Sequence, residues 1–159
     1  MIIDMFYEFH KKNKEWKLDI VGEGELRENL EKKIKRYKLE KFVKLRKYTD
    51  NIEKYYLNSS VYLMSSLYEG WGMVIGEAIE FGLPVISFNI SSAPEMIQDK
   101  YNGYIIENYN QEKYIECMLN LAQNNKLLKK MGKNSRDISK KKTNKLVAKN
   151  WIKLFEKIR

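Results

Sequence analysis

Residues 65–78 read SSLYEGWGMVIGEA, and they follow a short apolar run, VYLM, at residues 61–64. The apolar run is rich in β-prone residues and predicts a buried strand, whereas the pattern over residues 73–81 predicts a helix. Gly70 and Gly72 stand between the two and favour a turn. The segment therefore predicts a strand, a glycine turn and a helix in succession.

Two glutamates flank this turn: Glu69 on the turn itself and Glu77 inside the helix, roughly 6 Å along its axis from Met73. Glycines let a ligand approach the backbone, and the unpaired N–H groups at a helix start favour a phosphate. A carboxylate repels phosphate but accepts hydrogen bonds from hydroxyl groups, so Glu77 would suit a ribose and Glu69 a hexose. Acidic residues near a helix start are also common without any ligand, and the spacing alone leaves both interpretations open.

Helix and strand patterns alternate along the rest of the chain without an internal repeat or a low-complexity linker. With 159 residues, 43% of them hydrophobic, the chain can form one domain with a core. The alternation predicts a parallel sheet with helices on both faces and ligands at the carboxyl ends of the strands. Asp50 is the expected N-cap of the helix that follows it. We expect helices over residues 2–14, 25–38, 55–58, 73–81, 110–124, 126–139 and 144–158, a short helix from Pro94, and strands over 16–21, 42–45, 61–64, 84–88 and 104–106.

The glycine turn belongs to a longer pattern. Residues 77–87 read EAIEFGLPVIS, residues 93–97 read APEMI, and an Asn-Gly pair stands at 102–103. With the acid-glycine turn, these segments resemble the C-terminal domain of family 4 retaining glycosyltransferases, which have the type B fold. The upstream DIVGEGE at residues 19–25 and the Asn-Ile pair at 51–52 also match, so the resemblance covers nearly the whole chain.

The resemblance implies a fold and an activity. The fold would be α/β, a Rossmann-like parallel sheet with helices on both faces, forming the C-terminal half of a type B glycosyltransferase, with extra C-terminal helices. The complete enzyme would transfer a hexose from a nucleoside diphosphate sugar, with a UDP-sugar as the expected donor, to a glycan or lipid-linked acceptor, and would retain the anomeric configuration. Cell-envelope polysaccharide biosynthesis in the cytoplasm, at the inner face of the membrane in many relatives, would be its setting.

The resemblance also assigns residues to the donor site. Glu69 would be the catalytic carboxylate that positions the hexose, and Glu77 would hold the ribose. The diphosphate would lie at the helix start, and enzymes of this type typically use neither a metal nor a further cofactor. The remaining donor-binding residues that it implies are Gly70, Trp71, Gly72, Met73 and Val74 around the diphosphate, Gly22 and Gly24 beside the nucleotide, and Arg46 and Lys47 near the base.

Two parts of the relatives have no counterpart in this sequence. Relatives begin this domain with a strand whose following loop supplies an Arg and a Lys to the diphosphate, and residues 1–9 contain no such pair. The N-terminal acceptor-binding domain is also absent. We therefore expect residues 1–159 to be a single donor-binding domain, inactive alone, that works with the missing domain or with a separate partner that supplies it. A non-catalytic nucleotide-sugar-binding module and one half of a split enzyme are the alternatives.

The net charge of +9 suggests acidic partners such as nucleic acids or anionic membranes. However, Lys and Arg are spread over several predicted helices, and the densest run, residues 140–142, falls between two of them, where a solvated charge cluster is ordinary. We expect no nucleic-acid partner, and peripheral contact with a membrane stays open. No apolar stretch approaches the roughly 20 residues that a membrane span requires.

The chain has one cysteine and one histidine, and neither is expected to be catalytic. Cys117 falls in a predicted helix beside apolar residues and has no evident activating base, so it is expected in or near the core. His10 stands among charged residues without an orienting acid and is expected on the surface. No cluster of His, Cys, Asp and Glu has the spacing of metal ligands, so a bound metal is not indicated.

Overall fold

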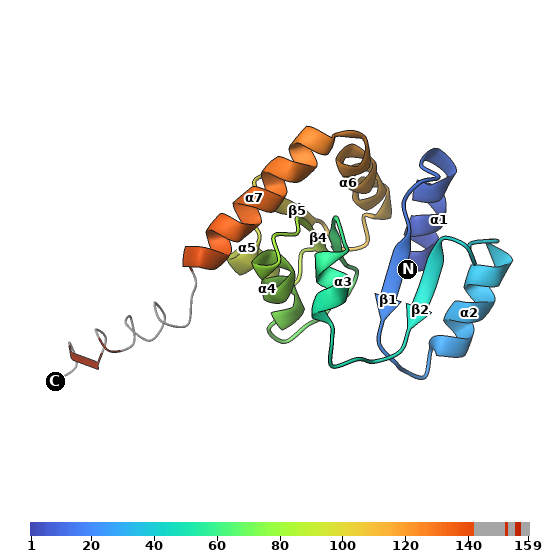
Figure 1. The fold of residues 1–159 in the computed structure, drawn as a ribbon, viewed down its shortest axis with the longest axis horizontal. Helices are drawn as coiled ribbons and strands as arrows, with labels where there is room; N and C mark the ends of the chain where they lie inside the picture. The colour runs from blue at the N-terminus through green and yellow to red at the C-terminus, as the bar shows by residue number, and fades with distance from the viewer. Residues whose placement is uncertain (142–151, 153–154, 157–159) are drawn as a thin grey trace.

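The computed structural model describes residues 1–141 together with residues 152, 155 and 156. Helices and short strands alternate along the described chain in the predicted order (Figure 1). Most of the helix expected over residues 144–158 lies outside the described residues. The elements are α1 (Ile2–Lys12), β1 (Leu18–Val21), α2 (Arg27–Arg36), β2 (Val43–Arg46), α3 (Glu53–Leu57), β3 (Tyr62–Met64), α4 (Met73–Glu80), β4 (Val85–Phe88), α5 (Ala93–Met96), β5 (Gly103–Ile106), α6 (Gln111–Gln123) and α7 (Asn125–Lys141).

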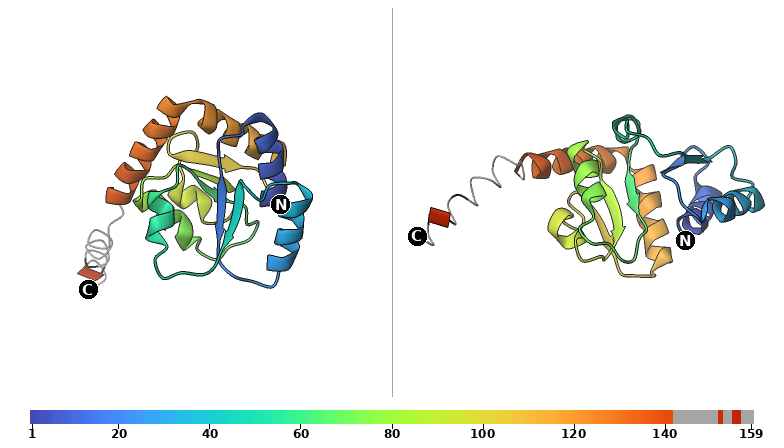
Figure 2. Two further views of the ribbon diagram at one scale, coloured as in Figure 1. Left: turned by 45° about the vertical axis from the view of Figure 1, so that its right-hand side comes forward. Right: turned by 90° about the horizontal axis from the view of Figure 1, so that it is seen from below.

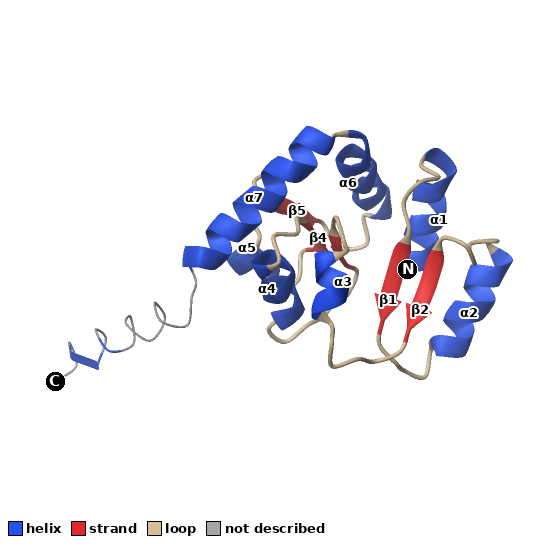
Figure 3. Ribbon diagram, in the orientation of Figure 1, coloured by secondary structure: helices blue, strands red, loops and turns tan. Residues whose placement is uncertain are grey.

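The described strands form two parallel ladders, where the sequence predicted one parallel sheet. β1 pairs with β2, and β4 pairs with both β3 and β5. Figure 3 shows β1 and β2 as a pair that lies apart from β4 and β5. Within the described residues no ladder joins β1 to β3, so each of these strands has one unpaired edge. The parallel direction predicted from the alternation of helices and strands is confirmed in both ladders.

Helices cover both faces of the larger ladder, as predicted. All four residues of β4 are buried, and successive side chains of a strand point to opposite faces. Ile86 and Phe88 therefore enter the core that includes residues of α1 and α6, whereas Val85 enters the core that includes residues of α4 and α7. The first core also contains side chains from the smaller ladder, so it joins the two ladders. In every view α2 and α7 lie at opposite ends of the molecule (Figures 1 and 2).

The Asn-Gly pair has a structural role at the start of β5. Asn102 is fully buried, and its Oδ1 accepts the N–H of Gln98 at 2.7 Å. A Cβ atom on Gly103 would overlap the carbonyl oxygen of Val85 on the neighbouring strand. The close approach of β5 to β4 therefore requires a glycine at this position.

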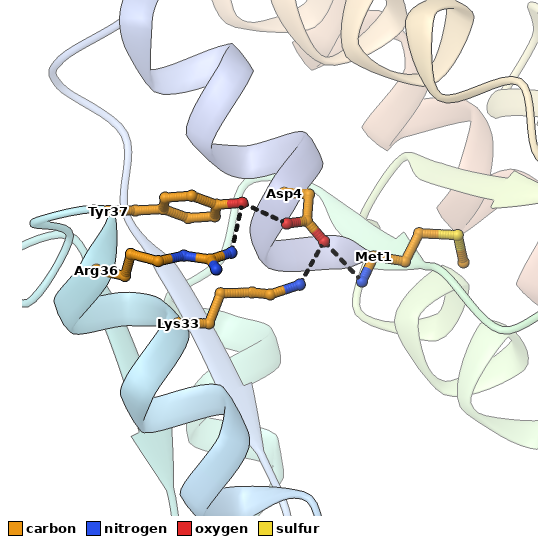
Figure 4. Close-up of polar contacts among 5 residues, drawn as sticks. All are labelled: Met1, Asp4, Lys33, Arg36 and Tyr37. Carbon is orange, nitrogen blue, oxygen red and sulfur yellow. Dashed lines mark hydrogen bonds and ion pairs between the residues drawn. The ribbon is translucent and has the colours of Figure 1, made fainter.

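A polar cluster around Asp4 joins α1 to α2 (Figure 4). The Asp4 carboxylate accepts hydrogen bonds from Lys33 Nζ and from the Tyr37 hydroxyl, both at 2.8 Å, and the Met1 amine lies 3.0 Å away. Arg36 Nη2 in turn donates to the Tyr37 hydroxyl at 3.3 Å. Burial favours the neutral acid, but these donors outweigh it and hold the pKa of Asp4 well below its usual value of 3.8.

Two predictions from the sequence, the N-cap at Asp50 and the exposed position of His10, were wrong. α3 begins at Glu53 after Ile52, and the N–H groups of Tyr55 and Tyr56 bond to the Ile52 carbonyl, so Asp50 stands too early to cap the helix. His10 is buried rather than exposed, because its ring packs against Phe42, with 4.1 Å between ring centroids. Burial, together with the charge of Lys14, lowers the pKa of His10.

We expect Gly103→Ala to lower the free energy of unfolding by about 3 kcal/mol, because the added methyl group forces β5 away from β4. Urea denaturation followed by circular dichroism measures the loss. Gly24→Ala is the matched control, since a Cβ atom at Gly24 meets no atom within 4 Å. Equal midpoints for the two variants would contradict the assigned contact.

We expect Asp4→Asn to lower the free energy of unfolding at pH 7 by about 0.5–1 kcal/mol, a modest value because the side chain is 34% exposed. The folded-state pKa of Asp4 lies below the unfolded value, so its contribution is present above pH 4 and is lost as the pH falls below about 4. The stability difference between wild type and variant should therefore shrink in acid. Asp50→Asn at an exposed position is the control, and a difference that stays constant from pH 7 to pH 3 would refute the assignment.

Candidate functional site

The turn after β3 ends at Gly72, which has a left-handed conformation with φ of 60° and ψ of 41°. The Gly72 carbonyl accepts the N–H of Ile75 at 2.8 Å, and α4 starts at Met73. Within the described residues, no backbone carbonyl accepts a hydrogen bond from the N–H groups of Met73 and Val74. Two backbone donors and the positive end of the helix dipole are therefore available to an anion.

The environment of Gly72 excludes any larger residue. A Cβ atom at Gly72 would lie 2.6 Å from the hydroxyl oxygen of Ser92, which is buried at the start of α5. Gly70 differs, since a Cβ atom there would meet no atom within 4 Å. Of the two glycines that mark the turn in the sequence, the structure therefore requires only the second.

The carboxylate of Glu77 is held in place by α3. Its Oε2 accepts the hydroxyl proton of Tyr56 at 2.9 Å, and the Tyr56 side chain is itself buried. Burial and this hydrogen bond raise the pKa of Tyr56, so the phenol remains a donor at neutral pH. The second carboxylate oxygen of Glu77 stays available to another donor.

Tyr62, in β3, connects the two predicted carboxylates. Burial, followed by the negative charges of Glu77 and Glu69, raises the pKa of Tyr62 to about 12. Both carboxylates therefore act on the same phenol, although eight positions separate them in sequence. Along the chain, Glu69 stands four residues before the start of α4 and Glu77 lies within this helix.

Glu69 lines an open cavity of about 510 Å³ at the carboxyl ends of three strands. Asn89 follows β4 and Asn108 follows β5, and both line this cavity. Ser91 lines it too, and its hydroxyl donates to the carbonyl of Glu69 at 3.4 Å. The sequence analysis missed these three residues, although their positions just after predicted strands were a usable signal.

The predicted nucleotide-side residues Gly22 and Arg46 lie together at the end of the smaller ladder. The N–H of Gly22 donates to the Arg46 carbonyl at 3.1 Å, and Arg46 Nε donates to Asp19 Oδ1 at 2.6 Å. The hydrogen bond with Asp19 and the negative charge of Asp19 raise the pKa of Arg46, and an electrostatic interaction with Tyr55 raises it more weakly.

The other predicted donor-binding residues are mostly exposed. Gly24 follows β1 and Lys47 follows β2, and both are exposed, as is Gly70. Trp71 and Met73 are 61% and 68% exposed, unusually high values for large apolar side chains. These two side chains are therefore free to contact a ligand or another part of a larger protein.

The one cysteine of the chain has a structural position. Cys117 is buried, as expected, and burial raises the pKa of its thiol to about 11, which keeps it protonated.

Across the described ranges, no group of three or more His, Cys, Asp and Glu residues is arranged to hold a metal ion. No helix in the same ranges is long and apolar enough to cross a membrane.

We expect Gly72→Ala to lower the free energy of unfolding by about 1–3 kcal/mol, because the left-handed conformation and the contact with Ser92 both oppose a side chain. Gly70→Ala, two residues away, is the matched control and should change the free energy of unfolding by less than about 0.5 kcal/mol. Urea denaturation of the two variants makes the comparison. A loss at Gly70 as large as that at Gly72 would contradict this description of the turn.

Relatives of known sequence extend well beyond this chain. An uncharacterized glycosyltransferase of Haemophilus influenzae is 36% identical over 130 residues, which are 81% of this chain and 37% of the relative. The poly(ribitol-phosphate) alpha-N-acetylglucosaminyltransferase of Staphylococcus aureus is 33% identical over 147 residues, 91% of this chain and 30% of the relative. The chain thus spans only about a third of the length of these relatives.

Solved structures and a family model agree with these similarities. The crystal structure of TarM superposes with a TM-score of 0.89 at 30% identity, over 97% of this chain and 31% of TarM. That of pneumococcal GtfA with UDP and GlcNAc gives 0.87 at 28% identity, over 99% of this chain and 32% of GtfA. Residues 1–138 match the family described as glycosyl transferases group 1. The chain therefore belongs to the group 1 glycosyltransferase family and has the fold of the type B enzymes.

Proposed function

We propose that this chain is the donor-binding part of a retaining glycosyltransferase that uses a nucleoside diphosphate sugar, with a UDP-sugar as the first candidate. The observation that carries the proposal is the start of α4. Two backbone N–H groups without an acceptor among the described residues, those of Met73 and Val74, stand between Glu69 and Glu77 in the sequence. Such an arrangement suits a diphosphate flanked by two hydroxyl-bearing rings.

In the proposed complex the diphosphate lies against the start of α4. Negative charge builds on the departing diphosphate during transfer, and oriented N–H groups stabilise it without reorganisation. These groups belong to Met73 and Val74, and Gly72 sets their direction. This contribution is electrostatic and requires no proton transfer from the chain.

The two carboxylates then orient the two rings of the donor. Tyr56 occupies one oxygen of Glu77, so the other can accept hydrogen bonds from the ribose hydroxyls. Glu69 lies beside the 510 Å³ cavity, which has the size of a small-ligand site and can hold the hexose. Glu69 is thus the catalytic carboxylate of the proposal, acting through orientation of the reacting sugar.

The uridine nucleotide and the acceptor class are proposed by similarity. Pneumococcal GtfA was crystallised with UDP and GlcNAc, and a TarM variant with UDP. Two of the similar enzymes are named for anionic polymer acceptors, poly(ribitol-phosphate) and poly(glycerol-phosphate), and GtfA of Streptococcus pneumoniae is named for a peptide acceptor. A cell-envelope polymer or glycan, made at the cytoplasmic face of the membrane, is therefore the proposed acceptor class.

We also propose that catalysis needs polypeptide beyond residues 1–159. Among the described residues β1 and β3 each have one unpaired edge, and one additional parallel strand that paired with both would satisfy these edges. The relatives are about two to three times as long as this chain, and GtfA of Streptococcus pneumoniae is itself named as a subunit. An acceptor-binding domain, in the same polypeptide or in a partner, would complete the enzyme.

Calorimetric titration with UDP, GDP and uridine tests the donor site. We expect UDP to bind more tightly than uridine, because the diphosphate gains the N–H groups of α4. Glu77→Gln should weaken UDP binding about tenfold, because a charge-assisted hydrogen bond to the ribose is lost. Glu80→Gln is the matched control: it makes the same change on an exposed residue of the same helix and should alter the dissociation constant less than twofold.

The titration can also refute the proposal. If neither UDP nor GDP binds at millimolar concentration, the donor-site assignment is wrong. If Glu77→Gln and Glu80→Gln bind UDP equally, the ribose assignment of Glu77 is wrong. Binding of UDP without any transferase activity, even after the acceptor-binding domain is supplied, would favour a non-catalytic nucleotide-sugar-binding module.

A further inference from the structure

The cavity beside Glu69 has a distinctive set of polar side chains. It is lined by one carboxylate, Glu69, by two carboxamides, Asn89 and Asn108, and by the hydroxyl of Ser91. Every residue that lines it is described, and none of them is a Lys, Arg or His. Tyr68, which also lines it, is 87% exposed and offers an aromatic face to a bound ring.

The two carboxamides come from neighbouring strands whose backbones are fixed. The N–H of Asn89 donates to the Ile106 carbonyl at 2.8 Å, which continues the pairing of β4 with β5 beyond the last strand residue. Asn108 lies in a turn that is closed by a hydrogen bond from the Asn110 N–H to the Glu107 carbonyl at 3.1 Å. Both side chains are exposed at the cavity.

These groups match the chemistry of sugar hydroxyls. A hydroxyl both donates and accepts, and a carboxamide offers two donors and an acceptor, so each Asn can bind two adjacent hydroxyls. The ionised Glu69 only accepts, and it therefore requires donors on the ligand. A ligand carboxylate would meet the negative charge of Glu69 with no cation among the lining residues to offset it.

We infer that this cavity selects a neutral hexose or N-acetylhexosamine as the transferred sugar and discriminates against a uronic acid, with Asn89 and Asn108 as specificity-determining residues. The inference rests on the proposed donor-binding function and adds the class of sugar. Asn89 and Asn108 hold the ring hydroxyls, and Glu69 both orients the ring and repels a sugar that carries its own carboxylate.

Calorimetric titration of the chain with UDP, UDP-glucose, UDP-N-acetylglucosamine, UDP-galactose and UDP-glucuronate tests the inference. We expect at least one neutral UDP-sugar to bind about tenfold more tightly than UDP-glucuronate. Asn89→Ala and Asn108→Ala should each raise the dissociation constant of that neutral sugar about tenfold and leave that of UDP unchanged. Glu69→Gln should reduce the discrimination against UDP-glucuronate at least threefold, because the repulsive charge is removed.

Asn29→Ala, an exposed position on α2, is the control for loss of an asparagine side chain and should change none of these constants. Tight binding of UDP with equal affinities for neutral and uronic donors would overturn this inference and leave the donor site intact. Unchanged binding of the neutral UDP-sugar by both Asn89→Ala and Asn108→Ala would also overturn this inference. If wild-type protein binds neither UDP nor any UDP-sugar, the proposed function and this inference are both overturned.

Discussion

The site depends on the buried strand β4 and on its parallel pairing with both neighbours. β4 places alternate side chains in two hydrophobic cores. A shift of its pairing register by one residue would therefore move these side chains out of the cores that they fill. Its register with β3 and β5 is therefore strongly specified. Parallel pairing then places the ends of all three strands at one edge, which is where Glu69, Asn89 and Asn108 meet. The cavity is a consequence of this alignment.

A second constraint acts at Gly72, where the chain passes from the turn into α4. The left-handed conformation and the close approach of Ser92 allow only glycine, and together they set the direction in which α4 starts. The same helix carries Glu77, whose carboxylate is fixed by Tyr56 of α3. The N–H groups that we propose for an anion and the carboxylate that we propose for hydroxyl groups therefore belong to the same helix. Glycine adopts the left-handed conformation without a steric penalty, so Gly72 can set the start of the helix without strain.

Local pattern was enough to predict the strand, the turn and the helix around Gly72, and with them the positions of Glu69 and Glu77. Asn89 and Asn108 were missed because their importance depends on which strands lie side by side, which a local pattern does not contain. His10 was placed on the surface because its sequence neighbours are charged, whereas contact with Phe42, 32 positions away, buries it. The separation into two ladders was not predicted either. The alternation of helices and strands indicates that the strands are parallel, but it does not indicate which strand edges are paired.

Charge explains why the described turn is not by itself a strong site for a diphosphate. The α4 N–H groups carry only partial positive charge, and Glu69 and Glu77 are the acidic residues nearest to them in the sequence. Arg46, at the end of the smaller ladder, is paired with Asp19, so much of its charge is already compensated. The net charge of +9 raises the local concentration of anions around the whole molecule but does not direct them to this turn. On the proposed function, tight binding of a diphosphate would require a further cation, and a strand that paired with β1 and β3 could supply it. The same additional strand would then complete the sheet and balance the negative charge of the proposed ligand.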